Sequence, residues 1–310
     1  MAKKDRSVQS KVLGICLCGI ALLGLFSFLW HFFSSAGYAG LDLTAISNMQ
    51  ELTPQICTAS TVGAENTLTD IRDEKTYLVR KLADNNCWMI QNLDLDLSSS
   101  ITLTSDDTDL NSKDSWTPHN STQATAGIAW TQDGGDTAQS MDPGKIYFSD
   151  GIGIGTADAE GNLQGVTSGQ PWEFIGNYYN WYAATAGSGT AIMRSASAAD
   201  SICPKGWRLP TNAGAGSFNT LLSTYNLQDN GSVSAVKLLQ APLNFVRSGA
   251  YYWSGQVYGQ GMGGAWWSAS ATQSTATHAY ILAISDTQVT PQAADYKGSG
   301  LAIRCIARSV

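Results

Sequence analysis

The sequence predicts an α+β fold: a mixed sheet with one or two short helices and long loops. Three observations support this prediction. Of the 310 residues, 43% are hydrophobic and only 14% are charged, which is typical of a globular chain. The 31 glycines, 12 tyrosines and 10 tryptophans favour sheet and loop over a bundle of helices. Strand and helix patterns follow one another without a regular β-α-β repeat, which argues against a parallel doubly wound sheet.

The N-terminus predicts a membrane anchor. Residues 1–11 form a basic flank, and the uncharged run "VLGICLCGIALLGLFSFLW" begins at Val12 and ends at Trp30. With the phenylalanines that follow, this segment (12–36) reaches the roughly 20 residues that a helix needs to span hydrocarbon. Because a basic flank stays in the cytoplasm, we expect a single-pass membrane protein whose C-terminal part is extracellular. The lipid bilayer is its first expected partner.

Cleavage of the apolar segment is the alternative. A cut after Ala39 in "SAGYAG" has the small residues that signal peptidases accept, and it would release a secreted protein. A cleavable signal usually has an apolar region of only about 7–15 residues. The longer run in this chain therefore favours an uncleaved signal-anchor.

Residues 37–67 are expected to form a stalk or the first helix of the exported part. Apolar residues recur there with a loosely helical spacing, and Pro54 is expected to end the pattern. The chain then predicts a meander, because turns at 72–75 and 83–86 separate the strands Thr76–Leu82 and Cys87–Leu93. After it, leucines alternate with Asn and Asp, which predicts a half-buried strand and not a metal site.

Residues 98–175 form a long insert rich in Ser, Thr, Asp and Gly, which predicts surface loops. Its segment "DTDLNS", from Asp107, imitates the start of a calcium-binding loop. Ser112 stands where that loop needs Gly, however, and Pro118 stands where it needs a bidentate Glu. The run "GIGIG" is not followed by a helical pattern, so a phosphate-binding loop is not predicted either.

Residues 176–307 are expected to complete the packed domain. The aromatic run "GNYYNWYAAT" at 176–185 is typical of a core element. A short helix capped by Ser217 is predicted from the helical spacing of Phe218, Leu221, Leu222 and Tyr225. Short strands are predicted in "WWSAS", "HAYILAIS", "TQVTPQA" and "GLAIRCIARS".

The cysteine count agrees with export. Two of the six cysteines lie inside the apolar segment, and the other four are Cys57, Cys87, Cys203 and Cys305. An even set in an exported domain predicts two disulfides, with three possible connectivities. No pair outside the membrane segment has the short Cys-x-x-Cys type of spacing that zinc sites use, so we expect no metal and no other cofactor.

Five stretches resemble successive blocks of the Fibrobacter succinogenes major paralogous domain. They are "LTDIRDEKTYLVRKLADNNCWMIQNLDL", "NYYNWYAAT", "CPKGWRLPT", "GAWWSAS" and "GLAIRCI", in that family's order, over 68–307. The family's members are bacterial exported or surface proteins, and its fold is grouped with C-type-lectin-like domains. The resemblance thus implies an extracellular domain over 68–307 with a disulfide-tied mixed sheet. It implies no particular biochemical function, and the insert is longer than the family's usual spacing.

The resemblance also implies the cysteine pairing. In a C-type-lectin-like arrangement a late strand returns beside an earlier one and a disulfide joins them. Cys203 is therefore expected to pair with Cys305, and Cys57 with Cys87. The run "CPKGWRLPT" is then a structural latch, and Arg208 is expected to pair with an acidic neighbour. The residues expected to pack at this latch are Trp207, Arg208, Pro210, Trp266 and Trp267.

The function expected from these features is recognition or adhesion at the cell surface, without catalysis or calcium. The net charge of −7 disfavours nucleic acid, so an extracellular glycan or protein is the expected ligand. Trp116, Trp130 and Trp172 lie in the polar insert and are expected to contact the ligand, because exposed aromatic rings anchor interfaces. The alternative for these three rings is that they pin loops to the core.

Two other functions are alternatives. An exported hydrolase could use a pair of carboxylates, whose separation a sequence does not give. Motifs of nucleophilic, zinc-dependent or phosphate-binding enzymes do not occur in the chain, so no catalytic residue is predicted. A purely structural protein of the cell envelope is the other alternative.

Overall fold

The computed structural model describes residues 41–95, 102–112, 114–116, 176–228, 232–252, 256–259 and 262–307. The chain divides into two units, Met1–Leu41 and Asp42–Val310, and the fold described below is that of the second. The anchor predicted over 12–36 lies outside the described residues. Within the ranges just given, no helix has the length and apolarity needed to cross a membrane.

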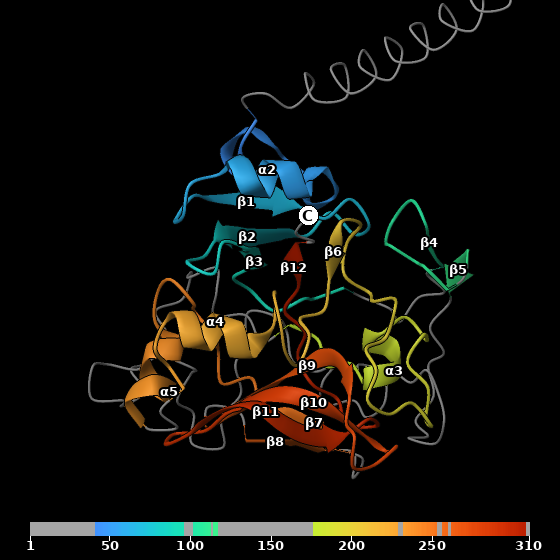
Figure 1. The fold of residues 1–310 in the computed structure, drawn as a ribbon. Helices are drawn as coiled ribbons and strands as arrows, with labels where there is room; N and C mark the ends of the chain where they lie inside the picture. The colour runs from blue at the N-terminus through green and yellow to red at the C-terminus, as the bar shows by residue number, and fades with distance from the viewer. Residues whose placement is uncertain are drawn as a thin grey trace, which may run out of the picture. The chain divides into compact units, whose positions relative to one another are not determined.

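The α+β prediction is confirmed, with mostly antiparallel sheets and a few short helices (Figure 1). One sheet has five strands in the order β1-β2-β3-β12-β6. Their bounds are β1 Glu65–Thr69, β2 Thr76–Lys81, β3 Cys87–Met89, β12 Ile306–Ala307 and β6 Trp207–Arg208. The last strand of the chain thus lies between a strand from the first meander and a strand from the middle of the sequence.

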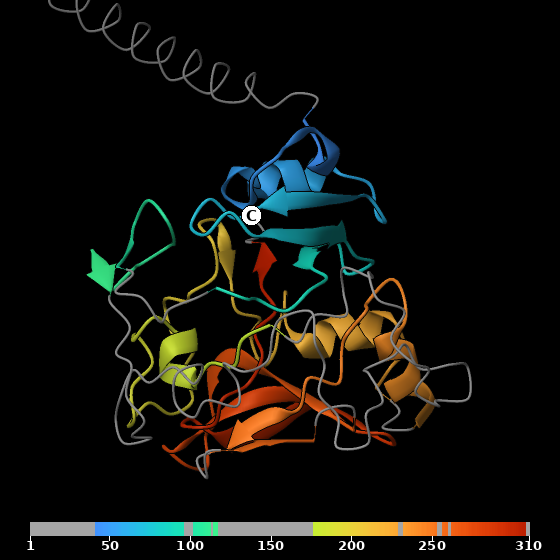
Figure 2. The ribbon, with the colours of Figure 1, turned by 180° about the vertical axis from the view of Figure 1, so that it is seen from behind.

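A second sheet has three strands, and two hairpins complete the described strands. The sheet has the order β11-β10-β9, with β9 at Gly264–Ala271, β10 at His278–Ile284 and β11 at Val289–Tyr296. The hairpins pair β4 (Leu103–Thr104) with β5 (Ser115–Trp116), and β7 (Ala250–Tyr252) with β8 (Gln256–Tyr258). The β7–β8 hairpin lies beside the three-stranded sheet in both views (Figures 1 and 2).

The described helices are short. They are the 3₁₀ turns η1 (Leu43–Ala45) and η2 (Met49–Glu51), and the α-helices α2 (Pro54–Ala59), α3 (Trp181–Ala184), α4 (Phe218–Thr224) and α5 (Ser232–Leu239). The predicted cap of α4 is confirmed, since Ser217 Oγ accepts a hydrogen bond of 3.1 Å from the Thr220 amide.

The prediction that Pro54 ends a helix is wrong, because Pro54 begins α2. Thr53 caps this helix by accepting from the Ile56 amide at 3.3 Å. Proline lacks an N–H, and the first helical position needs none, so proline is well tolerated there. Before it, residues 43–51 form two separate 3₁₀ turns and no continuous helix.

Two aromatic clusters make up the core. The first contains both cysteine pairs, Trp181, Trp207 and Trp267, all buried. The second contains Trp88 and Trp266 with residues of α4 and α5. In it the Phe245 ring packs edge-on against Trp266, with ring centroids 4.8 Å apart. Each buried aromatic removes about 150–250 Å² from water, so these rings are a large part of the stabilisation of the fold.

The buried cations Lys81, Lys297 and Arg304 are held by main-chain carbonyls. Lys81 Nζ donates to the carbonyls of α2 and its end, and Arg304 donates to the Leu243 and Asn244 carbonyls at 2.6 and 2.9 Å. Lys297, with none of its surface exposed, donates to the Thr190 and Met193 carbonyls at 2.9 and 3.0 Å. Its ammonium also lies 4.5 Å from the centre of the Trp181 ring.

These carbonyl bonds fix the loops that carry them. Burial lowers the pKa of Lys297 to about 8, which measures the cost of removing its charge from water. The carbonyl contacts offset part of that cost and hold the 190–193 turn to the β11 end of the sheet. No structural role for these three cations was predicted from the sequence.

We expect the free energy of unfolding to rise between pH 8 and pH 10.5 because of Lys297. Its pKa is about 8 in the folded chain and 10.5 when exposed, so the unfolded chain binds more protons in this window and a rise in pH favours folding. Urea unfolding at several pH values would measure the slope. Lys297→Met should flatten it, whereas Met in place of the exposed Lys237 should leave it unchanged. Equal slopes for both variants would contradict the assignment.

Candidate functional site

The latch is built on two disulfides. The structure joins Cys203 to Cys305 and Cys57 to Cys87, which are the two pairs that the resemblance implied. Cys305 immediately precedes β12, and β12 pairs with β6, where Ile306 faces Arg208. The Cys203–Cys305 bridge therefore fixes the last strand beside the "CPKGWRLPT" run, while the other bridge fixes α2 to β3.

The tryptophans of the latch lie in different layers. Trp207 and Trp267 belong to the cluster that contains the disulfides, and their Nε1 atoms donate to the Met49 and Tyr179 carbonyls at 2.8 and 2.7 Å. Trp266 belongs to the second cluster, because consecutive strand residues point to opposite faces. Its Nε1 donates to Asn92 Oδ1 at 2.7 Å, so Asn92, expected on a polar face, is buried.

Pro210 and Arg208 complete the latch through the main chain. Pro210 is buried, and its carbonyl accepts from the Ala269 amide at 2.8 Å. The Arg208 guanidinium donates to the carbonyls of Leu209, Ala215 and Gly216, and its expected pairing with an acidic neighbour stays a prediction. Gly216 has a φ of +69°, a left-handed conformation that favours glycine, and a Cβ there would displace that guanidinium.

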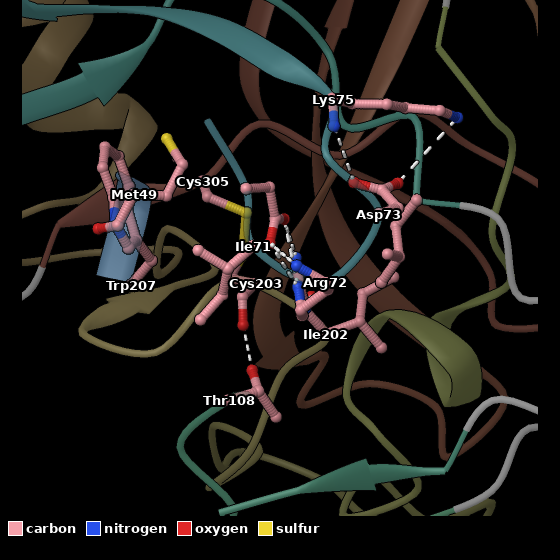
Figure 3. A network of polar contacts seen from close by, with 12 residues as sticks. Met49, Ile71, Arg72, Asp73, Lys75, Thr108, Ile202, Cys203, Trp207 and Cys305 are labelled. Atoms are coloured by element: carbon pink, nitrogen blue, oxygen red, sulfur yellow. Dashed lines mark hydrogen bonds and ion pairs between the residues drawn. A yellow bond between two sulfur atoms is a disulfide. The ribbon is translucent and has the colours of Figure 1, made fainter. Parts of the chain in front are cut away.

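A buried ion pair supports the disulfide from the first meander (Figure 3). Arg72 Nε and Nη2 donate to Asp70 at 2.9 and 2.6 Å, and Arg72 Nη1 donates to the Ile202 carbonyl at 2.5 Å. Ile202 directly precedes Cys203, so this guanidinium connects residues 130 positions apart. Burial alone would raise the pKa of Asp70, but the charge and hydrogen bonds of Arg72 and Gln50 hold it below its usual value.

A second group of charges lies at the edge of this network. Lys75 Nζ is 2.8 Å from Asp94 Oδ2. It is also 3.9 Å from Asp73 Oδ2 (Figure 3). Burial, and then the charge of Asp70, raises the pKa of Asp73. Burial also raises the pKa of Tyr77, whose hydroxyl accepts from the Asp94 amide at 3.1 Å. Lys75 thus contacts the carboxylates of both Asp73 and Asp94.

A model of the Fibrobacter succinogenes major domain matches residues 83–307, which is most of the chain. The chain belongs to this family. The match leaves out β1 and β2, although the resemblance was expected to begin at residue 68. Comparisons with curated proteins and with solved structures find no match.

In this family member the start of the insert is bound to the latch. Thr108 Oγ1 donates to the Cys203 carbonyl, and the Gly206 amide donates to Asp109 Oδ2 at 3.1 Å. The buried Asp200 accepts from the Asn111 and Ser112 amides and from the Ser112 hydroxyl. These hydrogen bonds join residues that lie about 90 positions apart in the sequence. They hold residues 102–112 in place on the domain.

The segment that imitates a calcium loop makes hydrogen bonds within the domain. Asp107 Oδ2 accepts from the amide and hydroxyl of Thr104, at 3.2 and 2.9 Å, and Asp109 caps the Gly206 amide. Among the residues that the structure describes, no group of three or more His, Cys, Asp or Glu side chains is placed to hold a metal ion.

The expectation that Trp116 presents an exposed ring is wrong, because only 5% of it is accessible. Trp116 lies in β5 opposite Leu103 and packs into the first cluster. The alternative, a ring that pins the loop to the core, describes it better. Trp130 and Trp172 lie outside the described residues. β4 and β5 have only two residues each, so an alternation of apolar and polar residues is too short there to predict this burial from the sequence.

Loss of the Cys203–Cys305 bridge should cost more stability than loss of the other. The bridges span 102 and 30 residues, and chain entropy predicts about 1 kcal/mol more for the longer span. Paired Cys→Ser variants can be compared by melting temperature, with Cys16→Ser as the control that should change nothing. Peptide mapping without reductant should recover both bridges, and free thiols at Cys203 and Cys305 in exported protein would contradict them.

Proposed function

We propose that this family member is a membrane-anchored surface protein that recognises an extracellular ligand without catalysis. The observation that carries the proposal is the use of the family's sequence blocks. The cysteines and tryptophans of these blocks are buried in disulfides, ring packing and main-chain hydrogen bonds, and the Asp70–Arg72 pair, which precedes the matched residues, is buried as well. Residues committed in this way form a rigid scaffold, and recognition then falls to loops mounted on it.

The disulfides support an exported location. Both bridges are buried, and structural disulfides persist mainly in oxidising compartments outside the cytoplasm. The basic flank and the apolar segment over 12–36 would anchor the chain in the cell membrane as a single-pass protein with the domain outside. Cleavage near Ala39 would make the same domain a secreted protein.

A C-type-lectin-like scaffold remains part of the proposal. In support of it, the last strand β12 returns between β3 and β6, and a disulfide joins its start to the segment before β6. Such a scaffold presents long loops from a rigid base. The ligand, a glycan or a protein, would meet the insert beyond residue 116 without calcium.

An exported hydrolase is the weaker candidate. Its best support is the proximity of Asp73 and Asp94, since a carboxyl with a raised pKa beside a second carboxylate is a pattern of acid catalysis. Lys75 contacts both of these carboxylates, and the hydrogen bonds around them stabilise the scaffold. We therefore propose no catalytic residue.

Protease added to intact cells should digest the domain and leave a fragment that contains residues 12–36. The physical reason is the basic flank, which keeps the N-terminus in the cytoplasm. Immunoblots with tags at both ends would separate the outcomes. Protection of the entire chain would contradict the topology, and a domain found in the medium without its N-terminal tag would indicate cleavage near Ala39.

Replacing residues 117–175 by a Gly-Ser linker should abolish adhesion while the domain stays folded. The boundary follows from the structure, because Thr108 and Trp116 are buried and must be retained. Adhesion of cells that display the parent or the variant to glycan-coated surfaces and to other cells would be measured, with melting temperature as the folding control.

A matched variant that also lacks 102–116 should melt at a lower temperature, since it loses the bonds to Cys203 and Asp200. If cells displaying the 117–175 deletion adhere as well as the parent, the insert is not the ligand-binding segment.

A further inference from the structure

The start of the insert is docked on one loop of the domain. Hydrogen bonds join residues 107–112 to residues 199–206: Lys205 amide to Asp107 carbonyl (2.9 Å), Gly206 amide to Asp109 Oδ2 (3.1 Å), Ser112 amide to Asp200 Oδ1 (3.3 Å) and Asn111 Nδ2 to Ala199 carbonyl (2.9 Å). Thr108 Oγ1 donates to the Cys203 carbonyl in the middle of this loop. The position of the docked segment therefore depends on where the main chain of the loop lies.

The Cys203–Cys305 bridge fixes this loop. Residues 199–206 belong to no helix or strand, so the pairing of regular secondary structure does not set their position. The bridge joins them to the residue before β12, inside the five-stranded sheet. Arg72 Nη1 also holds the Ile202 carbonyl, at 2.5 Å. The residues after Cys203 carry the bonds to Asp107 and Asp109, so their position depends on the bridge.

The bridge and the docked segment are buried together. None of the surface of Cys203, Cys305 or Thr108 is exposed, and Thr108 lies next to Cys203 (Figure 3). Leu110 packs against the core cluster that contains both cysteines. A thiolate must reach a sulfur atom to break a disulfide, so reduction needs an opening beside the bridge. Undocking of 107–112 would provide that opening.

We propose that the Cys203–Cys305 bridge and residues 107–112 form a redox-sensitive switch. The reductant is a dithiol: one of its thiolates attacks a bridge sulfur and forms a mixed disulfide, which its second thiol then displaces. The reductant leaves as a disulfide, its electrons and protons leave Cys203 and Cys305 as thiols, and 107–112 is released. The Cys57–Cys87 bridge still joins α2 to β3.

The switch deepens the function proposed above, because the released residues lead into the insert that is proposed to meet the ligand. Coupling between two sites is reciprocal, so the bridge should stabilise docking and docking should protect the bridge. Each direction has its own experiment, and neither uses adhesion as its readout.

Hydrogen exchange on the full chain in nanodiscs would test the first direction. The amides that donate across the contact report docking, and they are those of Asn111, Ser112, Lys205 and Gly206. In Cys203→Ser/Cys305→Ser they should exchange about tenfold faster, while the amides of α4 stay protected. The matched control, Cys57→Ser/Cys87→Ser, should keep the four amides protected.

The rate of reduction by dithiothreitol, followed by differential alkylation and mass spectrometry, would test the second direction. Thr108→Val and Asp200→Ala each remove bonds of the docked segment, so each should speed reduction of the Cys203–Cys305 bridge about tenfold. Asp84→Ala is the control, because Asp84 Oδ2 accepts from Trp88 Nε1 at 2.9 Å outside this contact. It should leave that rate unchanged.

Three results would overturn the switch. The four amides could remain protected without the bridge, or α4 could lose its protection with them, which would mean general unfolding. The third is an unchanged rate of reduction in both variants of the docked segment. Adhesion that depends on residues 117–175 would stand in each case, so the two proposals fail separately.

Discussion

The return of the last strand to the middle of the five-stranded sheet is the constraint on which this domain depends. β12 pairs with both β3 and β6, and Cys305 at its start is bonded to Cys203. The Arg72 guanidinium, neutralised by Asp70, holds the carbonyl next to Cys203. Loop closure over about 100 residues is costly in entropy, so a covalent bond and a buried ion pair are needed at the same point.

In this domain, buried polar side chains supply hydrogen-bond partners for main-chain groups that helices and sheets would satisfy in other folds. The helices are short and much of the chain is loop, so many carbonyls cannot find partners within a helix or sheet. Lys81, Lys297 and Arg304 supply donors to several of them, and Asp200 accepts from the start of the insert. This use of buried charge raises the cost of folding but fixes long loops in one conformation.

A fixed scaffold explains why recognition is proposed in the insert. Trp116, the last residue that the structure describes before the rest of the insert, is buried. Residues 117–175 contain neither a cysteine of the two bridges nor the Asp70–Arg72 pair. A rigid scaffold of this kind can carry loops of different sequence without a change of fold.

The sequence by itself determined the α+β class, the family, the expectation of two disulfides and the Ser217 cap of α4. These features depend on local patterns or short motifs, which neighbouring residues specify. Only the tertiary structure decided that Trp116 is buried, that Tyr258 is exposed and that Lys297 reaches carbonyls about 100 residues away. Burial depends on which distant segment covers a side chain, and in loops of low periodicity the sequence carries no repeating signal of that contact.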